Sequence, residues 1–128
     1  MSSPTAPESL SEIGQIALTM ADVPRSTAFY RDVLGLKFLF SAGPTMSFFA
    51  AGSVRLMLST PQGAGEPGKN SILYFKTADI RATYTTILGR GATAVSEPHR
   101  AAKMPTHELW LAAVRDPEGN VIELMSEV

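Results

Sequence analysis

The 128-residue chain contains no cysteine and no excess of charge of either sign. Without cysteine there is no disulfide, no thiolate metal ligand and no thiol nucleophile. Eleven Lys and Arg residues balance twelve Asp and Glu residues, so the clustered cations that bind nucleic acid are missing. No apolar run approaches the length that spans a membrane. We therefore expect neither a nucleic-acid nor a membrane partner.

The start of the chain lacks the basic and apolar regions of a signal peptide. Residues 1–12 predict a disordered N-terminal tail. Without a leader or cysteines, the expected location is the cytoplasm. Residues 13–128 are long enough for one domain with a sizeable core, and 45% of the chain is hydrophobic.

The chain does carry a pattern of strands and helices that occurs twice. Residues 13–20 alternate as a strand does, and Asp22 follows as the N-cap of a helix that extends to about Leu34 and ends at Gly35. Further strands are predicted over residues 36–40, 46–51 and 53–59. Residues 61–70, rich in Gly and Pro, predict a linker without packed structure.

The pattern restarts after the linker. Residues 71–77 predict a strand, and Asp79 predicts the cap of a second helix that extends to about Arg90. Three more strands are predicted over residues 92–97, 107–115 and 121–127, with an irregular, proline-containing segment over 98–106. The chain therefore predicts an α+β fold of two tandem βαβββ modules, residues 13–60 and 71–128, in a single domain. Each helix covers one face of its sheet, so we expect the uncovered faces to form an eight-stranded curved sheet around a cavity.

Glu123 is a candidate functional residue within this pattern. It lies in the last predicted strand, after the turn-forming residues 116–120, and shares a face with Val121 and Met125. A carboxylate among apolar neighbours is costly unless it is paired or bound to a metal. Two interpretations remain open from the residues alone: a functional carboxylate in the cavity, or a charge on a solvated face of the sheet.

Three motifs occur in the order in which a known family carries them. They are Ile13-x-Gln15-Ile16-x-Leu18-x-Met20-x-Asp22, Phe29-Tyr30-Arg31-Asp32-x-Leu34-Gly35-Leu36 and Asp116-Pro117-Glu118-Gly119-Asn120-x-x-Glu123. Through them the chain, from Ile13 to the C-terminus, resembles the vicinal oxygen chelate superfamily of glyoxalase I, bleomycin-resistance proteins and extradiol dioxygenases. The resemblance implies a homodimer whose cavities are completed across chains. It selects no single activity, because members do different chemistry on one scaffold.

In metal-dependent members the resemblance implies four inward-facing ligands. The corresponding positions here hold Gln15, Met57, Ile72 and Glu123. Isoleucine has no lone pair, and a thioether is a poor ligand for hard divalent ions. Gln15 and Glu123 alone supply too few donors, so we do not expect the usual four-ligand site. A divalent metal held by Gln15, Glu123 and a histidine such as His107 stays the alternative.

Strand parity extends the predicted cavity face beyond these four positions. The further polar residues of matching parity are Thr19, Arg55, Ser59, Tyr74 and Lys76. The opposite faces are nearly all apolar, as expected beneath the helices. Such a face predicts a small polar or anionic ligand, although Arg55 and Lys76 have the alternative of being solvated strand ends.

His99 lies within the irregular segment and His107 directly follows it, and their spacing matches no compact metal motif. Two interpretations are open: one of them converges on Glu123 as a ligand or acid/base group, or one lies in a surface loop and the other at a strand end. Trp110, nearby, is expected in the core or at a dimer interface.

Two functions therefore remain open, one of them non-enzymatic. The first is a protein that binds a small polar molecule in the cavity between the modules, as bleomycin-resistance-type members do, without the four-ligand metal site. The second is a metal-dependent lyase, isomerase or dioxygenase in which Glu123 is a general base or ligand. An apolar strand environment would raise the pKa of Glu123 toward the working pH, as a general base needs.

Overall fold

The computed structural model describes residues 9–128, and the first eight residues of the predicted tail lie outside the described part. The first module contains β1 (Gln15–Thr19), α1 (Val23–Ala28), the π-helical turn η1 (Phe29–Val33), β2 (Lys37–Ser41), the short 3-10 turn η2 (Gly43–Thr45), β3 (Met46–Ala51) and β4 (Val54–Ser59). The second contains β5 (Leu73–Lys76), α2 (Ile80–Gly89), β6 (Thr93–Lys103), β7 (Glu108–Arg115) and β8 (Val121–Glu127).

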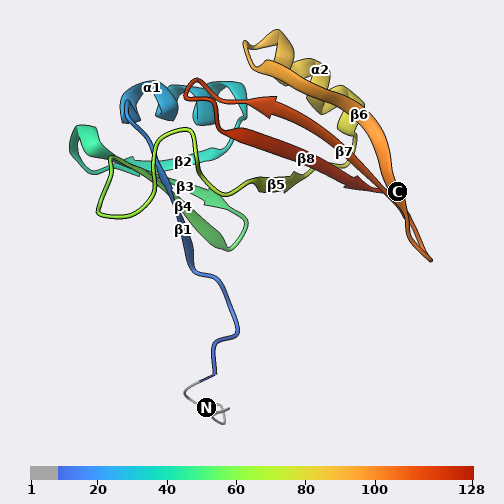
Figure 1. Ribbon diagram of the computed structural model, residues 1–128, viewed down its shortest axis with the longest axis horizontal. Helices are drawn as coiled ribbons and strands as arrows, with labels where there is room; N and C mark the ends of the chain where they lie inside the picture. The colour runs from blue at the N-terminus through green and yellow to red at the C-terminus, as the bar shows by residue number, and fades with distance from the viewer. Residues whose placement is uncertain (1–8) are drawn as a thin grey trace.

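The strands form two four-stranded sheets with the same internal order. The first sheet is ordered β1-β4-β3-β2 and the second β5-β8-β7-β6. In each sheet the first strand pairs in parallel with the last, and the other pairs are antiparallel. The sheets lie beside each other, with α1 over the first and α2 over the second (Figure 1). The predicted tandem βαβββ fold is confirmed, with its eight strands divided between two sheets.

Both helices begin as the sequence predicts. Asp22 Oδ1 accepts a hydrogen bond from the backbone N–H of Arg25, and Asp79 Oδ1 accepts one from Ala82, each at 3.1 Å. Gly35 then adopts the positive φ of 77° that lets the chain leave the first helix.

The first helix is less regular than predicted, because it changes to a π-helical turn at Phe29. Leu34 N–H donates to the carbonyl of Phe29, five residues earlier, at 3.1 Å. This wider turn contains two consecutive aromatic residues, Phe29 and Tyr30, that are both buried in the core.

Two of the boundaries that differ from the prediction lie at predicted site residues. Residues 98–103 are not irregular but belong to β6, which extends to Lys103. Pro98 is tolerated because β6 is an edge strand with register shifts around it, so no neighbouring strand needs its missing N–H. Conversely, β5 begins only at Leu73, so Ile72 precedes the strand in which it was predicted.

One hydrophobic core lies between the sheets and the helices. The most buried apolar strand positions on the helix side are at most 4% exposed and include Leu18, Phe49, Leu56, Leu58, Val114, Ile122 and Leu124. Burial of each such side chain contributes roughly 1.5–3 kcal/mol, so this face fixes the register of both sheets. Within residues 9–128, none of the helices has the length and apolar character that crossing a membrane requires.

The linker, residues 61–70, has no helix or strand but packs against the first module, contrary to the prediction. The side chain of Asn70 bonds both backbone groups of Thr19: Oδ1 accepts from its N–H at 2.8 Å, and Nδ2 donates to its carbonyl at 2.9 Å. A Cβ at Gly65 would lie 2.5 Å from Thr19 Oγ1. Glycine permits this approach because it carries no side chain.

Candidate ligand-binding site

Each sheet has one face that no helix covers, called its open face below. The open faces carry residues that strand parity selected. Across β1 and β4, Gln15 pairs with Arg55 and Ala17 with Met57. Across β5 and β8, Tyr74 pairs with Glu123. Ala17 and Tyr74 each lie five residues before their helix cap, so Met57 and Glu123 occupy equivalent positions in the two modules.

Met57 and Ile72, the apolar residues at two of the four implied metal-ligand positions, do not lie beneath a helix. Met57 is half-buried on the open face, paired with Ala17 on one side and Phe48 on the other. Ile72 is 48% exposed. Both positions therefore belong to the open side of the protein, where the family resemblance places metal ligands.

The residues at these positions do not fit a divalent metal. Gln15 Oε1, the atom that would coordinate, accepts a hydrogen bond from Arg55 Nε at 2.7 Å, and Gln15 Nε2 faces the sulfur of Met57 at 3.7 Å. A guanidinium in that place repels a cation. Within residues 9–128, no three His, Asp or Glu side chains are grouped so that they could hold a metal ion.

An aromatic row lies beside Arg55 on the first sheet. The rings of Phe40 on β2 and Phe48 on β3 are stacked, with centroids 4.6 Å apart and an interplanar angle of 23°. The guanidinium carbon of Arg55 lies 5.5 Å from the centroid of Phe48. Neither phenylalanine could be assigned to this face from the sequence, because the apolar run Phe48-Phe49-Ala50-Ala51 has no alternation that would reveal the open face.

Glu123 lies on the open face of the second sheet, partly buried among the side chains of its neighbours. Burial raises the pKa of Glu123, and the positive charge of His99 partly opposes this shift. His99 pairs with Leu111, which pairs with Met125, so His99 shares the open face with Glu123. The structure thus brings one of the two histidines near the carboxylate.

The ring orientation of His99 is set by the backbone carbonyl of Glu97 and the side chain of Ser96. Its Nδ1 lies 2.9 Å from the carbonyl oxygen of Glu97 and 3.3 Å from Ser96 Oγ. Because a carbonyl only accepts, Nδ1 is the donor, and Nε2 carries the lone pair when the ring is neutral.

Of three other predicted residues, His107 is engaged elsewhere, Thr19 is more covered than expected, and Lys76 is exposed. His107 lies at the far end of the second sheet, with Nε2 3.2 Å from Glu127 Oε2 and Nδ1 3.2 Å from Thr106 Oγ1. Thr19 is buried under the linker. Lys76 is exposed and pairs with Met125.

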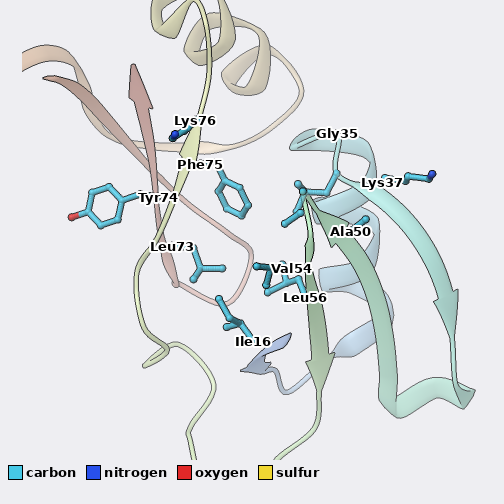
Figure 2. Close-up of a pocket in the computed structure, with 13 residues that line it drawn as sticks. Ile16, Gly35, Lys37, Ala50, Val54, Leu56, Leu73, Tyr74, Phe75 and Lys76 are labelled. Carbon is cyan, nitrogen blue, oxygen red and sulfur yellow. The ribbon is translucent and has the colours of Figure 1, made fainter. Parts of the chain in front are cut away.

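A pocket of about 650 Å³ lies where the two sheets adjoin, on their helix side. Its walls are mostly apolar, although Lys37 and Lys76 also line it, and Figure 2 shows Leu73 and Phe75 directed toward Ile16, Val54 and Leu56. Of the predicted site residues only Tyr74 and Lys76 line it, and the Tyr74 ring points away from it (Figure 2). This pocket therefore lies mainly outside the open faces that carry the polar residues, although Lys37 and Ala50 contribute to both.

The fold and the motif positions agree with the comparisons to known proteins. Residues 12–124 match the Glyoxalase/Bleomycin resistance protein/Dioxygenase superfamily, and the chain belongs to this superfamily. It is 26% identical to virulence protein STM3117 of Salmonella typhimurium over 125 residues, which cover 93% of this chain and 86% of that protein.

Solved structures show the same fold. A lactoylglutathione lyase from Agrobacterium tumefaciens is 26% identical, covers 92% of this chain and 95% of its own, and superposes with a TM-score of 0.74. TnmS3, an antibiotic binding protein from Streptomyces sp. CB03234, is 21% identical and matches in fold, with a TM-score of 0.76 and coverage of 93% and 98%. The scaffold is thus shared by a protein named as an enzyme and a protein named as a binding protein.

Proposed function

We propose that this protein binds a small polar or anionic molecule on its open sheet faces and does so without the four-ligand metal of its metal-dependent relatives. The observation that carries the proposal is the hydrogen bond between Arg55 Nε and Gln15 Oε1. It places a cationic donor where those relatives need a metal. The naming of one fold neighbour as an antibiotic binding protein supports a binding role on this scaffold.

A second copy of the chain completes the site in this proposal. The open faces expose large side chains that a monomer leaves in water: Phe40 is 49% exposed, Ile72 48% and Tyr74 51%. Apposition of the first sheet of one copy with the second sheet of another would cover these side chains, with the ligand held between the two sheets. Sedimentation velocity at several protein concentrations tests the homodimer. The cytoplasmic location stays a prediction from the sequence.

The binding proposal is tested on protein purified without chelator. Elemental analysis should find no stoichiometric divalent metal, and a thermal-shift screen of small acids, metabolites and antibiotics should find ligands whose stabilisation is reduced in Arg55→Met. Arg81→Met is the matched control, because Arg81 lies over Trp110, 5.4 Å from its ring centroid, on a different surface. Tightly bound metal at one equivalent, or ligand stabilisation unchanged in Arg55→Met, contradicts the proposal.

The raised pKa of Glu123 favours a second candidate function, general-base catalysis. A carboxylate with a raised pKa removes a proton next to a carbonyl more effectively than an ordinary one. The similarity to a lactoylglutathione lyase makes hemithioacetals the first substrates to assay. Glu123→Gln should abolish turnover while ligand binding persists. A variant that retains the wild-type rate excludes Glu123 as the base.

A further inference from the structure

Arg55 is held in place from two directions, although it lies at the protein surface. Gln15 Oε1 fixes its Nε at 2.7 Å, and the ring of Phe48 lies beneath its guanidinium at 5.5 Å. Among residues 9–128, no hydrogen bond or ion pair engages its two terminal nitrogens. A guanidinium restrained through Nε presents its terminal N–H groups as a fork that matches the two oxygens of a carboxylate.

The charge around this fork favours an anion. The four strands of the first sheet contain Lys37 and Arg55 and no acidic residue. Lys37 pairs with Ala50, which pairs with Arg55, so both cations lie in one row across the open face. No carboxylate of this sheet competes with a ligand for Arg55.

The aromatic rings of Phe48 and Phe40 extend across the sheet from the guanidinium of Arg55. Phe40 and Phe48 lie on neighbouring strands with their rings face to face, so the ring edges point away from the sheet. A planar aromatic ligand lying across these edges would make edge-to-face contacts, which are favourable because ring edges are positive and ring faces negative. The guanidinium carbon of Arg55 lies at most about 10 Å from the ring centroid of Phe40, because the two are linked through Phe48 by contacts of 5.5 Å and 4.6 Å.

We propose that the first sheet recognises a planar aromatic carboxylate, with the carboxylate on the terminal nitrogens of Arg55 and the rings across Phe48 and Phe40. This inference rests on the proposed binding function and specifies the ligand class of the same face. A fused two-ring acid such as 2-naphthoate spans the row, whereas benzoate reaches only Phe48. Single-ring acids therefore bind more weakly than two-ring acids.

The test is calorimetric titration of the full-length protein with three probes. These are 2-naphthoate, benzoate and 2-naphthalenemethanol, which has the rings without the charge. Naphthoate should bind at least about tenfold more tightly than the alcohol, because a bidentate charged pair is lost in the alcohol. It should also bind several-fold more tightly than benzoate. Equal affinities for acid and alcohol overturn the inference.

Two variants assign the contacts. Arg55→Met should weaken naphthoate about tenfold or more and leave the alcohol unchanged, with Arg81→Met as the arginine control. Phe40→Leu should weaken naphthoate several-fold and leave benzoate unchanged, because only the second ring reaches Phe40. Phe40 is half exposed, so this change leaves the core intact, and a thermal melt of each variant checks folding.

The outcomes separate this inference from the function on which it rests. If naphthoate fails to bind while another small anion binds through Arg55, the aromatic specificity is wrong and the proposed function stands. If naphthoate binds equally in Arg55→Met, both the fork and the ligand class are wrong. If no small molecule of any class binds, the proposed function itself is wrong.

Discussion

The hydroxyl of Tyr30, in the first module, donates a 2.8 Å hydrogen bond to Oδ2 of Asp116, in the second. Both residues are buried, and Asp116 also accepts from the backbone of Glu118 and Asn120 and from the Asn120 side chain. Burial raises the pKa of Tyr30, and the negative charge of Asp116 raises it further. The hydroxyl therefore keeps its proton and remains a hydrogen-bond donor. The turn at residues 116–120 is therefore part of the contact between modules as well as a connection between strands.

Tyr30→Phe should lower the free energy of unfolding by about 1–2 kcal/mol, because it removes one partner of a buried carboxylate without changing the ring that packs in the core. Urea unfolding monitored by the fluorescence of Trp110 measures this. Tyr84→Phe is the control, since Tyr84 is only partly buried and its hydroxyl has no bond to a residue of the described part. An effect no larger than that of the control contradicts the prediction.

Glu118 joins the modules at a second point, because its carboxylate binds the start of the first helix. Oε1 accepts from the N–H of Ala21 at 2.6 Å, and Oε2 accepts from the N–H of Asp22 at 2.7 Å and from Ser26 Oγ at 3.1 Å. We expect Glu118→Ala to cost about 2–3 kcal/mol, since it leaves these donors without a charged acceptor.

Guanidinium denaturation with circular dichroism as the readout tests this cost. The matched control is Glu66→Ala, because Glu66 is exposed in the linker and its nearest charge, Lys69 Nζ, is 3.9 Å away. The control should change stability by at most about 0.5 kcal/mol. Similar losses in both variants would show that the contact between Glu118 and the helix contributes little.

Two linker glycines provide a test of close packing against the second module. Both have positive φ, 95° at Gly63 and 80° at Gly68, but a Cβ at Gly68 would lie 2.8 Å from the carbonyl oxygen of Glu118, whereas a Cβ at Gly63 meets nothing within 4 Å. Gly63→Ala should cost about 1 kcal/mol through backbone strain alone.

Gly68→Ala carries the same strain and also forces the linker off the turn. It should cost at least about 1 kcal/mol more than Gly63→Ala in thermal or urea unfolding. Equal costs for the two variants would mean that the linker does not pack against the turn in solution.

Glu123 makes stability depend on pH in a direction that its environment sets. Burial raises its pKa above the usual 4.5, so the folded protein holds this proton more tightly than the unfolded chain does. The burial penalty is absent below the usual pKa and develops as the pH rises through the folded pKa. Glu123→Gln should therefore melt at a higher temperature than wild type at pH 7, and the difference should vanish at low pH.

Melting curves from acid to neutral pH test this relation, with Glu12→Gln, an exposed site before β1, as the control. His99→Gln should raise the pKa of Glu123 further, because it removes the opposing positive charge. Carboxyl chemical shifts in an NMR titration measure that pKa directly. A pKa unchanged by His99→Gln would show that the two side chains do not interact.

Much of the fold was predictable from local patterns. Asp22 and Asp79 predicted both helix starts because an N-cap needs only a side chain and the backbone three residues later. Parity in β4 and β8 predicted which residues face the core because one of the two faces must be apolar. The pattern was less successful around Pro98, whose compatibility with a strand depends on whether that strand lies at a sheet edge.

The candidate site was predictable only in part. Gln15 and Glu123 are the inward-facing positions that the family resemblance implies, and parity extends this face to Arg55 and Tyr74. The structure places all four on an open face. Phe40 and Phe48 did not follow, since their strands are apolar on both sides. The sequence did not indicate which of the two histidines lies near Glu123. In the structure His99 pairs into the sheet on the face of Glu123, whereas His107 contacts Glu127.

The amino-acid sequence by itself determined the repeat, the helix caps and the core-facing side of each sheet, because each depends on side-chain chemistry or on short-range periodicity. Only the tertiary structure decided that Arg55 bonds Gln15 beside stacked phenylalanines, and that the turn at residues 116–120 joins the modules. These contacts link residues far apart in the chain, and no local pattern encodes which distant strand will lie beside which.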